Sequence, residues 1–138
     1  MAVETQTVYD NGQTALVKVV GYFTGATTSN TLIVTANTLS YANVSQTCLL
    51  DIDKIDFTSK LNSGFAQLVF VGSSANTAAV AISNGTGTLP GMQNNATSPL
   101  GDLGLFVYKA ADGDSFTMYV TLRKRSGFSS AYTPYNNL

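Results

Sequence analysis

Charged residues are scarce in this sequence. Asp, Glu, Lys and Arg make up 11% of its 138 residues, against roughly 25% in an ordinary soluble domain. Uncharged polar residues take their place, among them 18 Thr and 11 Asn. The formal net charge of −1 gives only weak repulsion between free monomers. This composition predicts a polar but hardly ionic surface and favours an assembled working state.

Histidine is absent and cysteine occurs once. Without His, the chain has no Ser–His–Asp triad, no Cys–His pair and no imidazole metal ligand. A single Cys excludes an internal disulfide and a multi-cysteine zinc site. Cys48 stands in the apolar run CLLDI, so we expect a buried, inert thiol. We therefore expect a protein that is not an enzyme and that holds no metal or cofactor.

Long apolar runs are also missing. None approaches the roughly 20 residues of a membrane span, so no membrane partner is expected. The first residues, MAVETQTVYD, lack the basic and then apolar build of a signal peptide, which predicts synthesis in the host cytoplasm. A chain of this length is expected to form one domain.

What the sequence does contain is a period-two alternation of apolar residues, which predicts β-strands. In residues 13–23 the alternation places Ala15, Val17, Val19 and Phe23 on one face. Further strands are expected in the segments LIVTA, TCLLDIDKIDFT, FAQLVFVG and AAVAIS. No stretch shows helical periodicity over three turns. About seven or eight short strands with polar turns predict an all-β fold, a single antiparallel β-sandwich or jelly-roll-like domain.

Turn residues mark where these strands end. Asn11-Gly12 predicts a hairpin with a type I′ turn, and Asp112-Gly113 predicts a second hairpin between LGLFVYKA and SFTMYVTLRK. Residues 84–102 hold four Gly and two Pro and are expected to form a long functional loop. The chain thus divides into an N-terminal arm or edge strand (1–10), a sandwich domain (11–125) and a C-terminal tail (126–138).

The segment DIDKID, residues 51–56, has three Asp in six positions. It lacks the Gly and the Glu that an EF-hand loop requires. On an extended strand Asp51 and Asp53 would share a face about 6.6 Å apart, a spacing compatible with paired glycosidase carboxylates. The favoured interpretation is a strand with both carboxylates in water, Ile52 directed inward and a bulge before Ile55.

The segment TLRKRSGF, residues 121–128, holds three of the seven positive charges. Alternation places Arg123 and Arg125 on the outer face and Lys124 at the rim of the core, where its ammonium group would extend into water. A nucleic-acid site would need a wider basic stripe, so no nucleic-acid partner is expected. The two arginines remain available to carboxylates of a protein partner.

The order of segments resembles that of small virion structural proteins of tailed bacteriophages, particularly marine and cyanobacterial ones. The resemblance covers residues 13–125 and rests on LVKVVGYFTG, LSYA, LDIDKIDFTS, LVFVG, the Gly/Pro/Asn-rich segment and GDSFTMYVTLRK. Phe57 stands where such proteins often have Trp, and residues 126–138 lie outside the pattern. The resemblance implies a non-enzymatic protein built into the phage particle.

Together these observations favour a capsid decoration (cement) protein on the virion surface. We expect its partners to be the major capsid protein and further copies of this chain, a trimer being one such arrangement. Two alternatives remain: a neck or tail protein of the virion, and a carbohydrate-binding module using Asp51, Asp53 and exposed tyrosines. The residues expected to contact the partner are Arg123, Arg125, Phe128, Tyr132, Pro134, Tyr135, Tyr119, Leu89 and Met92.

Overall fold

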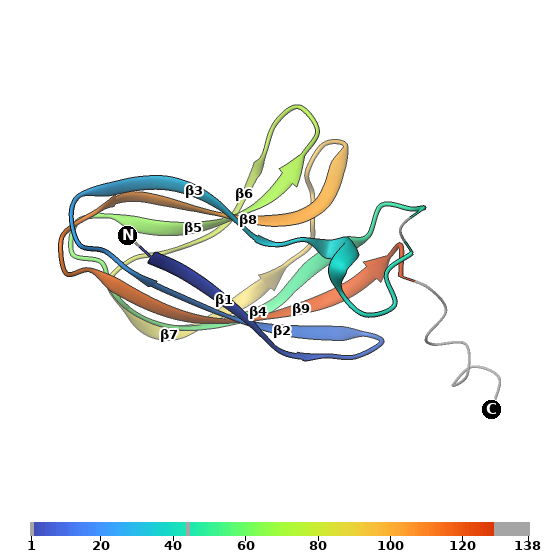
Figure 1. Ribbon diagram of the computed structural model, residues 1–138, viewed down its shortest axis with the longest axis horizontal. Coiled ribbons are helices and arrows are strands. Elements are labelled where there is room, and N and C mark those ends of the chain that lie inside the picture. Colours follow the sequence, from blue (N-terminus) through green and yellow to red (C-terminus); the bar gives the residue numbers. More distant parts are fainter. Residues whose placement is uncertain (1, 44, 129–138) are drawn as a thin grey trace.

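A computed structural model describes residues 2–43 and 45–128, which form two antiparallel β-sheets packed face to face (Figure 1). The predicted all-β sandwich is confirmed. Within the described residues the single helical element is a 3₁₀ turn at Ala36–Thr38. No helix in this part of the chain is long and apolar enough to cross a membrane.

The five-stranded sheet has the order β1-β2-β9-β4-β7 and the four-stranded sheet the order β3-β8-β5-β6. The strands of the first are β1 (Ala2–Asp10), β2 (Thr14–Tyr22), β4 (Leu49–Lys60), β7 (Gly85–Met92) and β9 (Ser115–Ser126). Those of the second are β3 (Thr27–Val34), β5 (Phe65–Gly72), β6 (Thr77–Ile82) and β8 (Pro99–Ala110).

The core lies between the sheets and follows the predicted alternation. Ala15, Val17 and Val19 of β2 are at most 2% exposed, and Phe23 is 1% exposed. The inward residues of the other central strands are buried in the same way, among them Leu68, Phe70, Leu105, Val107, Met118 and Val120. Burial of these side chains supplies the main stabilisation of the fold.

The first predicted hairpin is present, but its turn differs from the prediction. β1 and β2 pair antiparallel from Asp10↔Ala15 onward. Neither Asn11 nor Gly12 has the positive φ that a type I′ turn requires. Instead, the side-chain oxygen of Asn11 accepts hydrogen bonds from the amides of Gln13 and Thr14, each at 2.8 Å. The predicted edge strand over residues 1–10 is β1.

The second predicted hairpin is wrong. β8 belongs to the four-stranded sheet and β9 to the five-stranded one, so the turn at Asp112-Gly113 carries the chain from one sheet to the other. The turn chemistry itself holds, because Gly113 has a φ of 86° and Asp114 accepts a hydrogen bond from the Ala111 amide at 2.8 Å. Alternation identifies a strand's inward face but not its sheet.

The Gly and Pro content of residues 84–102 predicted one long loop, and this prediction is wrong. Residues 85–92 form β7 at the edge of the five-stranded sheet, and β8 begins at Pro99. The predicted bulge in β4 is confirmed by a register shift between Ile52 and Lys54. Gly91 of β7 lies against it, and a Cβ there would come within 2.3 Å of the Asp53 carbonyl oxygen. Glycine is therefore required where the edge strand meets the bulge.

The segment TGATTSNT, residues 24–31, has the polar composition of a turn, yet β3 already starts at Thr27. Its first residues alternate between half-buried and exposed positions without large apolar side chains. They are held in the sheet by pairing with β8, from Thr27↔Ala110 to Val34↔Leu103. Backbone pairing therefore extends this strand beyond its apolar pattern.

Candidate interaction surfaces

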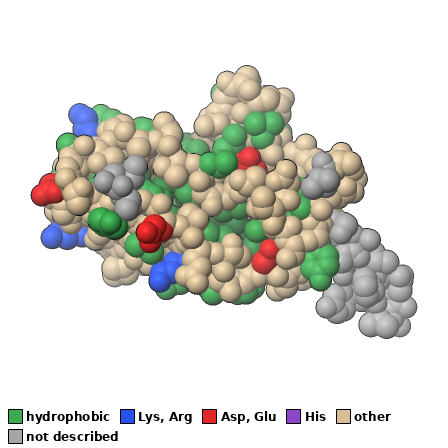
Figure 2. All heavy atoms as spheres, in the orientation of Figure 1, with side chains coloured by type: hydrophobic (Ala, Val, Ile, Leu, Met, Phe, Trp, Pro, Cys, Tyr) green, Lys and Arg blue, Asp and Glu red, His purple; other side chains and the backbone are tan. Residues whose placement is uncertain are grey.

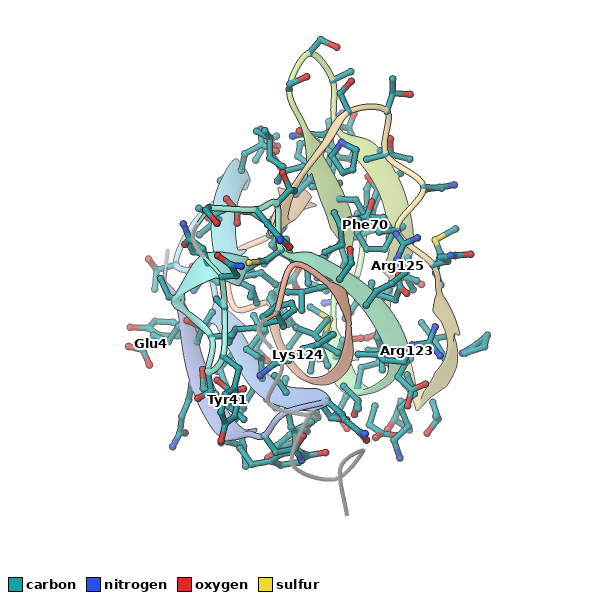
Figure 3. The ribbon with its side chains drawn as sticks, turned by 90° about the vertical axis from the view of Figure 1, so that its right-hand side faces the viewer. Glu4, Tyr41, Phe70, Arg123, Lys124 and Arg125 are labelled. Atoms are coloured by element: carbon teal, nitrogen blue, oxygen red, sulfur yellow. The ribbon has the colours of Figure 1, made fainter. Side chains whose placement is uncertain are left out.

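The three basic residues near the end of β9 point to two different sides of the strand. Figure 3 shows Arg123 and Arg125 on one side and Lys124 on the other. The predicted separation of the two arginines from Lys124 is therefore correct. The contacts that the two arginines make, and those that Lys124 makes, differ from the prediction.

Both arginines meet Asp51, which is 1% exposed. Arg123 Nη2 lies 3.3 Å from Asp51 Oδ2, and Arg125 Nε lies 3.3 Å from Oδ1. The Asn94 amide donates to Oδ1 at 2.7 Å, and Arg125 Nη2 donates to the Asn94 carbonyl oxygen at 2.9 Å. The expectation that Asp51 lies in water is wrong, because the arginines and the segment after β7 cover it.

Asp51 and Asp53 consequently do not form a pair of accessible carboxylates. Asp53 is exposed, but it is the extra residue of the bulge and has no partner position on β9. Asp51 already accepts one amide hydrogen bond and two arginine contacts. This arrangement suits a structural ion-pair network and offers no site for paired acid catalysis.

The sequence predicted that the Lys124 ammonium group extends from the rim of the core into water, and this prediction is wrong. The Lys124 side chain is fully buried. The ammonium group donates to Asp10 Oδ1 and to the carbonyl oxygens of Asn11 and Ser40. It also lies 5.1 Å from the ring centre of Phe128. Lys124 thus ties the end of β9 to the first hairpin and to the segment after the 3₁₀ turn.

Asp10 is the carboxylate of this cluster, and its pKa is lowered. Burial by itself would raise the pKa above 3.8. Hydrogen bonds from Lys124 and Ser40, with the positive charge of Lys124, outweigh burial and bring the pKa below that value. A carboxyl group whose pKa is lower in the folded state stabilises the fold above its unfolded pKa. That contribution is lost as the pH falls through the folded pKa.

The remaining predicted contact residues fall into three groups. Leu89 and Met92 lie in β7 and are partly buried against the core, as is Phe128, which forms a bridge with Ala42. Tyr119 is 38% exposed on β9. Tyr132, Pro134 and Tyr135 lie outside the described residues. Their roles as partner contacts stay predictions.

An aromatic patch on the outer face of the four-stranded sheet was not predicted. It consists of Phe65, Phe106 and Tyr108, whose ring centres lie 5.2–6.0 Å apart. Tyr108 is 36% exposed, and the two Phe residues are half-buried. The alternation in FAQLVFVG and LGLFVYKA already directs these rings away from the core, so counting outward aromatic residues would have identified the patch.

A hollow adjoins this aromatic patch. It has a volume of about 200 Å³ and lies over Gly104, which has no side chain to fill the sheet surface. Leu32 and Val69 stand opposite Gly104 on the neighbouring strands. Leu32 is 54% exposed. The polar side chains of Asn30, Thr31 and Asn76 also line the hollow. The outer face of the four-stranded sheet thus combines an aromatic projection with a hollow of mixed apolar and polar lining.

The outer face of the five-stranded sheet is polar over β4, β7 and β9. A depression of about 370 Å³, which we call the Tyr119 hollow, is lined among others by Asp56, Thr58, Thr86, Thr88, Thr117 and Tyr119. Elsewhere charge is sparse. On the face that Figure 2 shows, charged side chains stand singly among uncharged ones.

Among the described residues, no three His, Cys, Asp or Glu side chains lie close enough to share a metal ion. Cys48 is 3% exposed, and its thiol donates to the Gly127 carbonyl oxygen at 3.1 Å. The prediction of a buried thiol is confirmed.

Comparisons with known proteins return no family model and no curated protein that matches the sequence. Solved structures of similar shape include a carbohydrate binding module of family 29, with 10% identity, a TM-score of 0.41 and 90% of each chain covered. Another is the CBM22-1-GH10 portion of Clostridium thermocellum xylanase 10B, complexed with xylohexaose. It has 8% identity and a TM-score of 0.40, with 90% of this chain and 25% of that one covered. The likeness is one of β-sandwich architecture.

Proposed function

We propose that this chain is a structural protein of a bacteriophage virion, a capsid decoration protein that binds the assembled lattice of the major capsid protein. The resemblance of residues 13–125 to phage virion proteins and the sparsely charged surface support this role. The observation that carries the proposal is the aromatic patch with its adjoining hollow on the four-stranded sheet.

This surface has the properties of a protein-binding site. Contiguous exposed apolar residues on a small domain usually mark an interaction surface, and aromatic residues are enriched among those that dominate binding energy. The residues beside Phe106 on the adjacent strands are Asn30 and Gln67, and the Lys109 ammonium lies 5.2 Å from the ring centre of Tyr108. The patch is therefore surrounded by uncharged polar groups and one positive charge. A partner with an apolar projection that enters the Gly104 hollow would complement this face.

Binding of this kind would stabilise a capsid by linkage. A protein that binds the assembled shell better than free capsid subunits stabilises the shell by its binding free energy. Each interface can be weak when one oligomer contacts several capsid subunits, because the later contacts form at high effective concentration. A homo-oligomer would therefore suit this role better than a monomer.

The test is binding to capsids that lack the protein, measured by co-sedimentation. Replacing both Phe106 and Tyr108 by Ser removes two of the three rings, and we expect the dissociation constant to rise about tenfold or more. A matched variant with Tyr9→Ser and Tyr22→Ser removes two exposed rings from the other sheet and is expected to bind as the wild type does. With both variants folded by circular dichroism, equal binding by the two would contradict the proposal.

A further inference from the structure

The Tyr119 hollow is built from two rows of side chains that cross the five-stranded sheet. Strand pairing aligns Lys18 with Tyr119, Tyr119 with Asp56, and Asp56 with Thr88. The adjacent row aligns Thr117 with Thr58, and Thr58 with Thr86. Adjacent strands are about 4.8 Å apart, and the rows are two residues apart along each strand, about 6.8 Å. The rows therefore bound a trough that runs across the strands.

The trough brings an aromatic ring together with several hydrogen-bonding groups. One exposed aromatic ring stands beside four threonine hydroxyls and a carboxylate. Thr88 donates to Asp56 Oδ1 at 2.6 Å, whereas Asp56 Oδ2 has only a loose contact with Lys54 Nζ at 3.8 Å. That oxygen remains able to accept hydrogen bonds from a ligand.

Tyr119 offers its ring to the same ligand. Its side chain is 38% exposed, and the Lys18 ammonium lies 5.9 Å from the ring centre, near the outer limit of a cation–π contact. The ring is therefore not tightly covered from that side. A flat aromatic face next to fixed hydrogen-bonding groups suits a ligand that has both an apolar C–H face and hydroxyl groups.

We propose that the Tyr119 hollow binds a neutral oligosaccharide, with a sugar ring stacked on Tyr119 and its hydroxyls bonded to Asp56 and the threonines. This inference does not depend on the proposed role in a capsid. The carboxylate of Asp56 disfavours phosphate and acidic sugars. The ammonium group of Lys54 lies near the Asp56 carboxylate, and Lys18 and Glu4 line one depression beside the hollow. The surface therefore attracts neither sign of charge strongly.

The two sheets would then bind different partners. On the four-stranded sheet the three rings contact one another and adjoin a hollow with Leu32 and Val69 in its lining, which suits a protein surface. On the five-stranded sheet the exposed ring of Tyr119 adjoins hydroxyls and a carboxylate, with the half-buried Phe57 also in the lining, which suits a polyhydroxylated ligand. A chain attached to a particle through the first face would leave the second face accessible.

The test is affinity electrophoresis of the full chain through gels that contain neutral polysaccharides, namely galactomannan, xylan, dextran and glucan, with polygalacturonate as the acidic comparison. We expect retardation by at least one neutral polymer. Tyr119→Ala should weaken that binding about tenfold, while Tyr119→Phe, which keeps the ring, should stay within about threefold of the wild type.

The matched control is Tyr108→Ala, which removes a ring of similar exposure from the opposite sheet and is expected to leave retardation unchanged. Absence of retardation by every neutral polymer would overturn the proposal. Retardation by polygalacturonate alone would also overturn it, as would a loss of binding in Tyr108→Ala equal to that in Tyr119→Ala. Capsid co-sedimentation measures the other face, so the two proposals can fail separately.

Discussion

Lys124→Met is expected to lower the free energy of unfolding by about 3 kcal/mol, at the lower end of what breaking a buried ion pair costs. The substitution removes the donor shared by Asp10, Asn11 and Ser40. Met fills a similar volume, so the expected loss comes from three acceptors left without a partner. Asp10 is 15% exposed and retains some water, which places the loss below the upper end. Urea denaturation at neutral pH measures it.

Two comparisons separate this loss from a general effect of replacing lysine. Lys18→Met, on the polar outer face, is expected to change stability by no more than about 0.5 kcal/mol. The loss from Lys124→Met should also shrink on acidification below pH 3.8, because the Asp10 carboxylate, whose lowered pKa depends on Lys124, becomes protonated in the wild type as well. Equal stability of the two lysine variants at neutral pH would contradict the buried network.

Asp51→Ala is expected to cost a similar amount, about 3 kcal/mol. It leaves the Asn94 amide, a donor on a residue that is 6% exposed, without its acceptor. It also removes the carboxylate from Arg125, whose side chain is 32% exposed. Arg123 is 62% exposed, so its share of the effect is small, and Arg123→Ala alone should cost about 1 kcal/mol or less.

The matched control for this substitution lies two residues away. Asp53→Ala removes an exposed carboxylate from the bulge and is expected to be neutral within about 0.5 kcal/mol. Thermal or urea unfolding of the two alanine variants gives the comparison directly. If Asp51→Ala and Asp53→Ala unfolded alike, Asp51 would not be the centre of a buried network.

Periodicity predicted those parts of the fold that depend on local sequence. The segments that became β2 and β5 were both predicted to be strands, and the inward face of β2 is the predicted one. β7 could not be predicted in this way, because its residues are mostly small and polar, and its hydrogen bonds come from pairing with β4. Assignment of β8 and β9 to one hairpin failed for a related reason: a short turn joins neighbouring strands equally well within a sheet and between two sheets.

In the candidate site too, local sequence predicted some features, whereas others depend on contacts between distant residues. Alternation correctly separated Lys124 from the two arginines, but it could not show what each faces. Lys124 is buried because Asp10, Asn11 and Ser40 surround its ammonium group. Asp51 is buried because Asn94 and Arg125 pack against its carboxylate. These contacts join residues that are 30 to more than 100 positions apart, and no local pattern records them. The aromatic patch differs from these buried contacts, because the alternation within each strand already shows that its rings point outward.

The central claim is that this chain decorates a capsid, and its copy number per particle tests that claim most directly. Quantitative gel analysis of purified virions, with the major capsid protein as the internal standard, gives the number. A protein that binds the capsid lattice should be present in hundreds of copies, in a fixed ratio to the capsid protein. About a dozen copies would place it in a ring at the neck or tail, and its absence from the particle would contradict a virion role altogether.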